Sequence, residues 1–131
     1  MNATNNVIIS AGDLARIQSS LSKINTEVAD FLQAELDRAT VLDDQEFPEN
    51  VVNMGSTVTF RDISTGQTLR CTLVYPHQAD VAEKRISILA PVGAALIGLT
   101  EGATIDWPVP GGKFRTLEVM SVEQASRKVE I

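Results

Sequence analysis

The sequence of 131 residues predicts an α+β protein in which a short N-terminal antiparallel helical hairpin precedes a small antiparallel sheet covered by one helix. Three observations predict this fold class. Apolar residues recur at spacings of three and four over residues 10–39, alternate with polar residues from Ser56 onward, and form one Gly- and Ala-containing apolar stretch over residues 91–99. These patterns are typical of amphipathic helices, of strands and of a short buried helix, respectively.

The first helix is predicted to begin at Ser10, with Asp13 three residues later, because both side chains can accept hydrogen bonds from the free N–H groups of a first helical turn. Its apolar face comprises Leu14, Ile17, Leu21 and Ile24. The regular spacing of these residues predicts that this face is buried.

A second helix is predicted after Asn25 and Thr26, either of which can cap it. Its apolar positions are Val28, Phe31, Leu32, Leu36 and Ala39. Glu27 and Asp30 fall in its first turn, where the helix dipole favours acids. The short break indicates a hairpin whose arms have about 14 residues each, or roughly 20 Å at a rise of about 1.5 Å per residue.

The helical region is followed by a linker. Residues 41–55 contain several acids, Pro48 and Gly55, with no sustained period, and Pro48 prevents a helix from crossing them. We therefore expect a hairpin with an acidic linker over residues 1–48 and a sheet domain over residues 49–131.

Five segments of the sheet domain are predicted as strands. Their apolar positions or bounds are Val58 and Phe60; Leu69, Cys71, Leu73 and Tyr75; Ile86 and Ile88; Ile105, Trp107 and Val109; and about Phe114 to Val122. The turn residues Ser64–Gly66 and Pro110–Gly112 separate neighbouring strands. Pro91 is placed as in a first helical turn and predicts one short, largely buried helix between the third and fourth strands.

The net charge of −6 lies on the first third of the chain. Residues 1–50 contain nine acids and three strong bases (3 − 9 = −6), whereas residues 51–131 contain eight of each. This balance argues against nucleic-acid and anionic-membrane binding, which need clustered Lys and Arg. No apolar run approaches the roughly 20 residues of a membrane span, there is no secretory signal, and the single cysteine forms no internal disulfide, so a cytoplasmic protein is expected.

The sequence offers few residues for catalysis. His77 has no neighbouring Cys or His for a zinc site, and Cys71 lies on the apolar face of a strand. The run Gly111–Lys113 lacks the spacing of a phosphate-binding loop. Glu27 and Asp30 share one helical face at the hairpin tip, where they either complement the helix dipole or help hold a cation with a partner's ligands. We expect no catalytic residue, no metal site and no cofactor.

Several motifs resemble a known family. The stretch Ala90–Leu99, followed by Glu101-Gly102 and Pro110–Gly112, resembles the C-terminal domain of the bacterial Gre transcript-cleavage factors. Further motifs are similar to the regulators of nucleoside diphosphate kinase, a Gre-like group with a short hairpin: Phe47-Pro48, Val51-Val52, Met54, Ser56-x-Val58-x-Phe60-Arg61 and Thr72–Pro76. The resemblance covers about residues 42–123, and Ala34–Ala39 extends it into the helices.

The resemblance implies an FKBP-like fold for residues 50–123 and docking at the rim of the RNA polymerase secondary channel. Leu89, Ala90, Pro91 and Val92 would dock the domain, and the hairpin would enter the channel. Gre factors use tip acids on long arms to assist RNA cleavage. Because the arms here are less than half as long, Glu27 and Asp30 are expected to contact basic channel walls instead, and the protein is expected to compete with Gre-type factors without cleaving RNA.

Three alternatives follow from the same residues. The protein could stimulate transcript cleavage through Glu27 and Asp30. It could be an FKBP-like peptidyl-prolyl isomerase, although the domain contains few aromatics to line a pocket. The apolar seam of the hairpin could also pair with a second copy, and the sequence leaves monomer and homo-oligomer open.

Overall fold

The computed structural model describes residues 7–109 and 113–124, with the backbone alone for 107–109 and 113–114. The predicted turn at Pro110–Gly112 lies outside these residues, as do the side chains of Trp107 and Phe114. The described elements are β1 (Ile8–Ser10), α1 (Ala11–Leu21), α2 (Glu27–Asp37), β2 (Thr40–Leu42), η1 (Asp44–Glu46), β3 (Thr57–Asp62), β4 (Thr68–Val74), η2 (Pro76–Gln78), η3 (Val81–Glu83), β5 (Arg85–Ser87), α3 (Pro91–Leu96), β6 (Thr104–Val109) and β7 (Lys113–Glu123). The expected α+β class is confirmed.

Both N-terminal helices begin at the predicted caps. Ser10 Oγ accepts a hydrogen bond from Asp13 N at 3.2 Å, and Thr26 Oγ1 accepts one from Ala29 N at 3.1 Å. Each helix has 11 residues, or about 16 Å of length, so the arms are shorter than the sequence suggested. Ile24 lies beyond the end of α1 and is 38% exposed, so it does not extend the buried face.

A two-stranded parallel sheet joins the outer ends of the helices and was not predicted. Ile8 pairs with Thr40 and Ser10 with Leu42, so β1 and β2 bring together the start of α1 and the end of α2. Strands of three residues are too short to give a recognisable alternating pattern. The segment that the sequence marks as a linker therefore begins within a strand.

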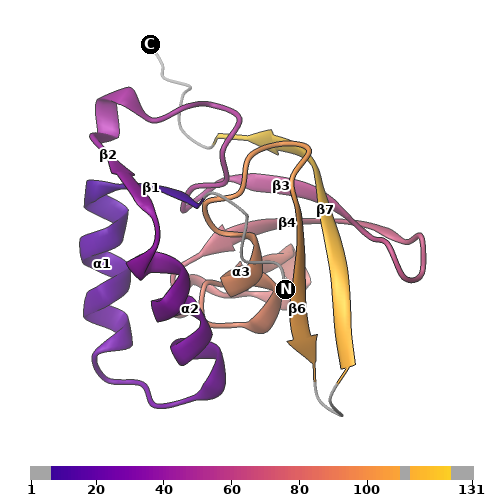
Figure 1. Cartoon of the computed structure of the whole chain (residues 1–131), viewed down its shortest axis with the longest axis horizontal. Coiled ribbons are helices and arrows are strands. Elements are labelled where there is room, and N and C mark those ends of the chain that lie inside the picture. The colour runs from indigo at the N-terminus through magenta and orange to yellow at the C-terminus, as the bar shows by residue number, and fades with distance from the viewer. Residues whose placement is uncertain (1–6, 110–112, 125–131) are drawn as a thin grey trace.

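The main sheet has the strand order β5-β4-β3-β7-β6 and is mixed (Figure 1). The expectation of an all-antiparallel sheet is wrong at one edge, because β5 pairs with β4 in parallel, from Thr72↔Arg85 to Val74↔Ser87. Residues 75–84 carry the chain back along the sheet in two 3-10 turns, so β5 starts beside β4 and runs in the same direction.

All three helices described in the structure lie on one side of the main sheet, where α3 is placed between α2 and the strands (Figure 1). The other face of the sheet is polar and contains two ion pairs across strands, Arg61 with Glu118 at 2.7 Å and Arg70 with Glu123 at 2.9 Å. The sheet therefore buries one face and exposes the other, as antiparallel strands with alternating sequences commonly do.

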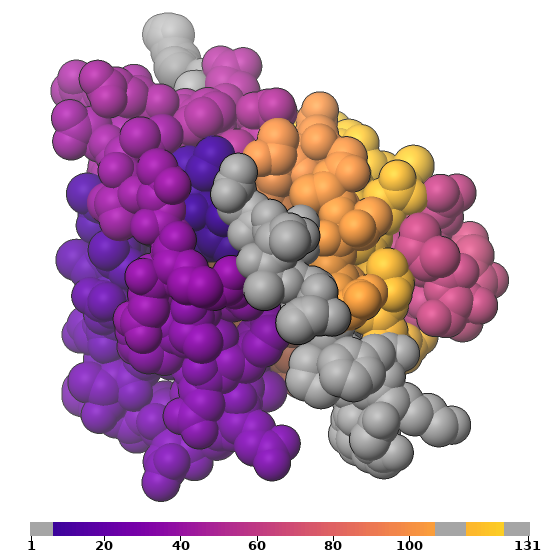
Figure 2. All heavy atoms as spheres, viewed as in Figure 1, coloured from indigo at the N-terminus to yellow at the C-terminus, as the bar shows by residue number. Residues whose placement is uncertain are grey.

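The hydrophobic core is continuous from the helix pair to the sheet. Ile17 of α1 and Leu32 of α2 are fully buried in the same cluster as Leu73 of β4 and Leu96 of α3. Figure 2 shows the spheres of α2 and of the segment after it forming one flank of the molecule. The helix pair thus packs along the domain for much of its length. The division at residues 48 and 49 stays a prediction.

Candidate partner-binding surface

The two acids predicted at the hairpin tip are exposed. Glu27 is the first residue of α2 and Asp30 lies one turn further, after the Thr26 cap. The neighbouring Lys23 is also exposed, so residues 22–30 have a net charge of 1 − 2 = −1. The tip can offer carboxylates to a basic partner, but its net charge is small.

The other acids of the first fifty residues are spread over the molecule. Asp13 and Glu35 are each only 7% exposed, and Glu35 accepts a hydrogen bond from Arg38 at 2.6 Å. Asp44 accepts one from Gly12 N at 3.0 Å, at the end of α1 opposite the tip. The net charge of the first fifty residues is therefore not concentrated at the tip, because periodicity does not tell where each charge lies in space.

Asp13 has a role different from the predicted cap. Its backbone N–H is capped by Ser10, whereas its carboxylate accepts hydrogen bonds from Tyr75 OH at 3.1 Å and from Met54 N at 3.2 Å. Arg16 Nη1 lies 3.4 Å from the same carboxylate. These contacts, which we call the Asp13 latch, join α1 to the turn before β3 and to the end of β4.

The latch perturbs Tyr75. Burial of the phenol, followed by the negative charge and hydrogen bond of Asp13, raises the pKa of Tyr75 from its ordinary value of 10.0 to about 12, and nearby Arg16 partly opposes this rise. The phenol is therefore a stable hydrogen-bond donor at neutral pH. The alternating pattern before Pro76 predicts Tyr75 as a strand residue, and no local pattern marks its partner 62 residues away.

The predicted docking segment, Leu89 to Val92, forms the entry to α3. Ser87 holds its start, since Leu89 N donates to Ser87 Oγ and Ala90 N donates to Ser87 O, both at 2.9 Å. Pro91 is exposed at the first position of the helix, while Leu89, Ala90 and Val92 are half-buried. The segment offers a small apolar surface on a fixed backbone.

Gly93 sets how closely α3 approaches β5. A Cβ atom built on Gly93 would lie 2.2 Å from the Ser87 carbonyl oxygen, so only glycine fits without displacing backbone. Ser87 therefore holds the start of the docking segment by hydrogen bonds, and its carbonyl lies against the helix that follows. Elements α2 and α3 contact each other, so the helix that contains Glu27 and Asp30 packs against the helix that follows the docking segment.

The residues with chemical reactivity do not converge. Burial raises the pKa of the Cys71 thiol from 9.0 to about 11, which leaves it unreactive at neutral pH, and His77 is exposed in η2. Within residues 7–109 and 113–124, no cluster of three or more His, Cys, Asp and Glu side chains is arranged to hold a metal ion. No helix in this part of the chain is long and apolar enough to cross a membrane.

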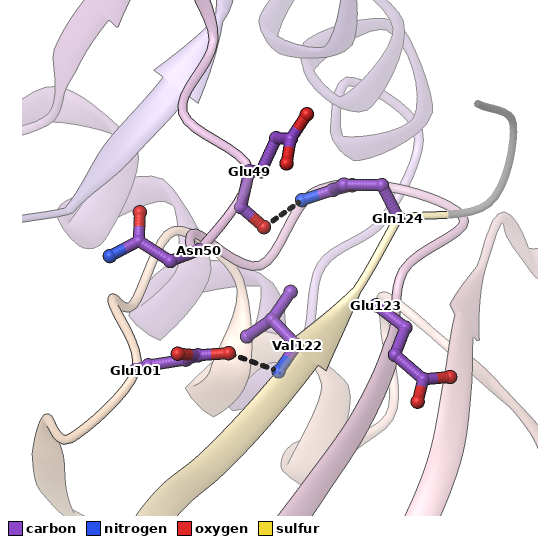
Figure 3. A pocket seen from close by; sticks show the side chains of 6 residues that line it. All are labelled: Glu49, Asn50, Glu101, Val122, Glu123 and Gln124. Carbon is purple, nitrogen blue, oxygen red and sulfur yellow. Dashed lines mark hydrogen bonds between the residues drawn. The ribbon is translucent and has the colours of Figure 1, made fainter.

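A pocket at the C-terminal end of β7 is lined by acids, yet its polar groups join backbone segments (Figure 3). Glu101 Oε2 accepts a hydrogen bond from Val122 N at 2.9 Å. Gln124 Nε2 donates to the carbonyl oxygens of Glu49 at 3.1 Å and Val51 at 2.7 Å. The carboxylates of Glu49 and Glu123 point in different directions in Figure 3. The other polar groups of the pocket form hydrogen bonds that hold the end of β7 against neighbouring backbone segments.

Comparisons with known proteins agree with this fold. Residues 47–124 match the family described as the C-terminal domain of the transcription elongation factors GreA and GreB. The chain is 42% identical over 120 residues to the regulator of nucleoside diphosphate kinase of Escherichia coli K12, covering 89% of this chain and 88% of that protein. It is 40% identical over 91 residues to GreA of Thermodesulfovibrio yellowstonii, covering 70% of this chain and 57% of that factor.

A solved structure is also similar over nearly the whole chain. The protein described as prokaryotic transcription elongation factor GreA/GreB from Nitrosomonas europaea is 43% identical, with a TM-score of 0.73. The match covers 90% of this chain and 98% of that one, so the likeness includes the helix pair as well as the sheet.

Proposed function

The chain belongs to the family of GreA/GreB transcription elongation factor C-terminal domains, and on this premise we propose that it is a non-catalytic regulator of transcription that binds RNA polymerase at the rim of the secondary channel. The observation that carries the proposal is the 42% identity to a regulator of nucleoside diphosphate kinase across 89% of the chain, helices included. Binding there would place the protein in competition with Gre-type factors.

The dimensions of the helix pair support occupancy without catalysis. Helices of 11 residues reach about 16 Å, and their inner faces are buried against the domain. Glu27 and Asp30 therefore stay close to the body of the protein, and a role at a distant polymerase active site would need a much longer arm. Their exposure suits contact with basic groups at the channel entrance.

The segment from Leu89 to Val92 is the proposed docking contact of the domain. It combines an exposed proline with half-buried apolar side chains on a backbone fixed by Ser87. A preformed surface of this kind binds without the cost of ordering a loop. The FKBP-like description of residues 49–131 is part of the same proposal and rests on the family resemblance.

Binding to core RNA polymerase at low salt tests the proposal directly. We expect co-sedimentation, displacement by an added Gre factor, and weaker binding of the Glu27→Gln/Asp30→Asn double variant. Added salt should weaken binding of the unaltered protein more than that of the variant, because charged contacts are screened. A matched control is Asp43→Asn/Glu46→Gln, which removes two exposed acids from the opposite end of α1.

The outcomes separate the proposal from its alternatives. Absence of binding, or binding that a Gre factor does not affect, contradicts the proposal. Cleavage of backtracked RNA that depends on Glu27 and Asp30 would assign the protein to the cleavage factors. Sedimentation of the free protein distinguishes a monomer from an oligomer, and an oligomer that covers α1 and α2 could not present the tip acids.

A further inference from the structure

A shallow groove separates α1 from the start of the β4–β5 connection. Its walls are Ala15, Arg16, Ser19 and Ser20 of α1 on one side and Tyr75 and His77 on the other. The two walls are about 60 residues apart in the chain, so no local sequence pattern marks the groove. We call it the Arg16 groove.

The two walls of the Arg16 groove belong to segments that neighbour the two parts of the proposed polymerase-binding surface in the chain. Ser19 and Ser20 lie in the last turn of α1, just before the tip that contains Glu27. Tyr75 follows Val74, whose carbonyl accepts a hydrogen bond from Ile88 N at 2.8 Å, directly before the docking segment. One wall of the groove thus belongs to the helix that leads to the tip, and the other follows the strand whose last residue bonds to Ile88, next to the docking segment.

The groove presents hydrogen-bond donors and a positive charge. The Arg16 side chain is 63% exposed, and its ion pair with Asp13 is long at 3.4 Å and uses one of its two terminal nitrogens, which leaves other guanidinium N–H groups for a ligand. Ser19, Ser20 and His77 can add hydroxyl and imidazole donors. Asp13 is buried, accepts bonds from Tyr75 and Met54, and is not among the residues that line the groove.

The walls are held in place on both sides. The Asp13 latch joins Tyr75 to α1. On the opposite wall, Tyr75 N donates to Gln78 Oε1 at 3.2 Å and Gln78 N donates to Tyr75 O at 2.9 Å, which closes the turn that carries His77. The donors therefore stand on a preformed frame and need no rearrangement to meet a ligand.

We infer that the Arg16 groove receives an acidic side chain of the partner, with Arg16 as its main contact. This inference rests on the proposed function, since it names the chemistry of the partner at that same surface. The protein then offers carboxylates at its tip and a cation in the adjoining groove. Such an alternation of charge sets the register of docking and disfavours partners with the opposite pattern.

Two substitutions in the groove test the inference. Arg16→Gln removes the charge and should weaken binding to core polymerase by roughly three- to ten-fold at low salt, the range of an ion pair that becomes partly desolvated. Ser19→Asp adds a carboxylate at an exposed position of α1 and should weaken binding at least as much by repelling the partner's acid. Urea unfolding midpoints of both variants show whether the fold is retained.

Matched controls make the same charge changes far from the groove. Arg70→Gln alters an exposed arginine on the outer sheet face, and Gln67→Asp adds an acid in the β3–β4 turn, which Figure 1 shows on the side of the molecule opposite α1. Both should bind like the unaltered protein. If all four variants bind equally, the groove inference is wrong while the proposed function stands.

The remaining outcomes are also decisive. Tighter binding of Ser19→Asp would mean that the groove faces a basic group, which overturns the inference. If the unaltered protein does not bind polymerase at all, the proposed function fails and the inference falls with it. Loss of binding in Arg16→Gln and Ser19→Asp, with unchanged unfolding midpoints and normal binding of both controls, supports an acid-accepting groove.

Discussion

The pKa of Tyr75 responds in opposite directions to substitution of its two charged neighbours. Asp13 Oδ1 lies 3.1 Å from the phenol oxygen, and Arg16 Nη1 lies 3.4 Å from the same carboxylate oxygen. Asp13→Asn removes a negative charge that opposes phenolate formation. Arg16→Gln removes a positive charge that favours it. We therefore expect the first substitution to lower the pKa of Tyr75 and the second to raise it.

The size of the first change follows from the causes of the shift. Burial is the largest cause of the rise from 10.0 to about 12, and Asp13 contributes through its charge and its hydrogen bond. Burial persists in Asp13→Asn, so the pKa of Tyr75 should fall below 12 and stay above 10. Asp30→Asn removes an exposed acid at the tip and serves as the control, which should leave this pKa unchanged.

The assay is simple because the chain contains a single tyrosine. Phenolate absorbance after a rapid jump to alkaline pH reports the folded state before unfolding exposes the ring. The raised pKa also links to stability: the contribution of Tyr75 is fully present below pH 10 and is lost as the pH rises from 10 through about 12, because the unfolded chain releases its proton first. An unchanged pKa in Asp13→Asn, or a lowered one in Arg16→Gln, would refute the Asp13 latch.

Three further predictions concern packing. Leu32→Ala should destabilise the protein by about 3 kcal/mol, since the side chain is fully buried where α2 meets the domain. Urea unfolding of this variant should remain a single transition, and two transitions would contradict a continuous core. Gly93→Ala should lower the free energy of unfolding by roughly 1–3 kcal/mol in the same measurement, because the added methyl would lie 2.2 Å from the Ser87 carbonyl oxygen. An unchanged unfolding midpoint would contradict the close packing of α3 against β5. Cys71 should react with thiol reagents only after unfolding, and rapid labelling of the native protein would contradict its burial. The raised pKa of its thiol also predicts a contribution to stability that is present below pH 9 and is lost between pH 9 and about 11. This pH dependence should be absent from Cys71→Ala.

Local sequence patterns predicted the elements well where burial follows a regular period. The spacing of Ile17 and Leu21 in α1, and of Leu32 and Leu36 in α2, identified faces that are buried in the structure. The caps at Ser10 and Thr26 were likewise visible, because a capping side chain and the backbone N–H that donates to it lie within one helical turn. The family motifs predicted the docking segment, whose role in binding stays a prediction.

Two parts of the candidate surface could not be predicted in this way. The carboxylate of Asp13 finds its partners 41 and 62 residues along the chain, and the Arg16 groove forms between elements of similar separation. The parallel placement of β5 depends on the course of residues 75–84 over the sheet. None of these features leaves a periodic signal, because each depends on which surfaces meet.

The sequence by itself determined the class of fold, the caps, the buried faces of both helices and the net charge of −6. Only the tertiary structure decided where that charge lies: the acids are divided between the tip, the opposite end of α1 and the interior. The physical reason is that periodicity records which side of an element avoids water, whereas a charge acts at a position, and its position depends on the packing of α1 and α2 along the sheet.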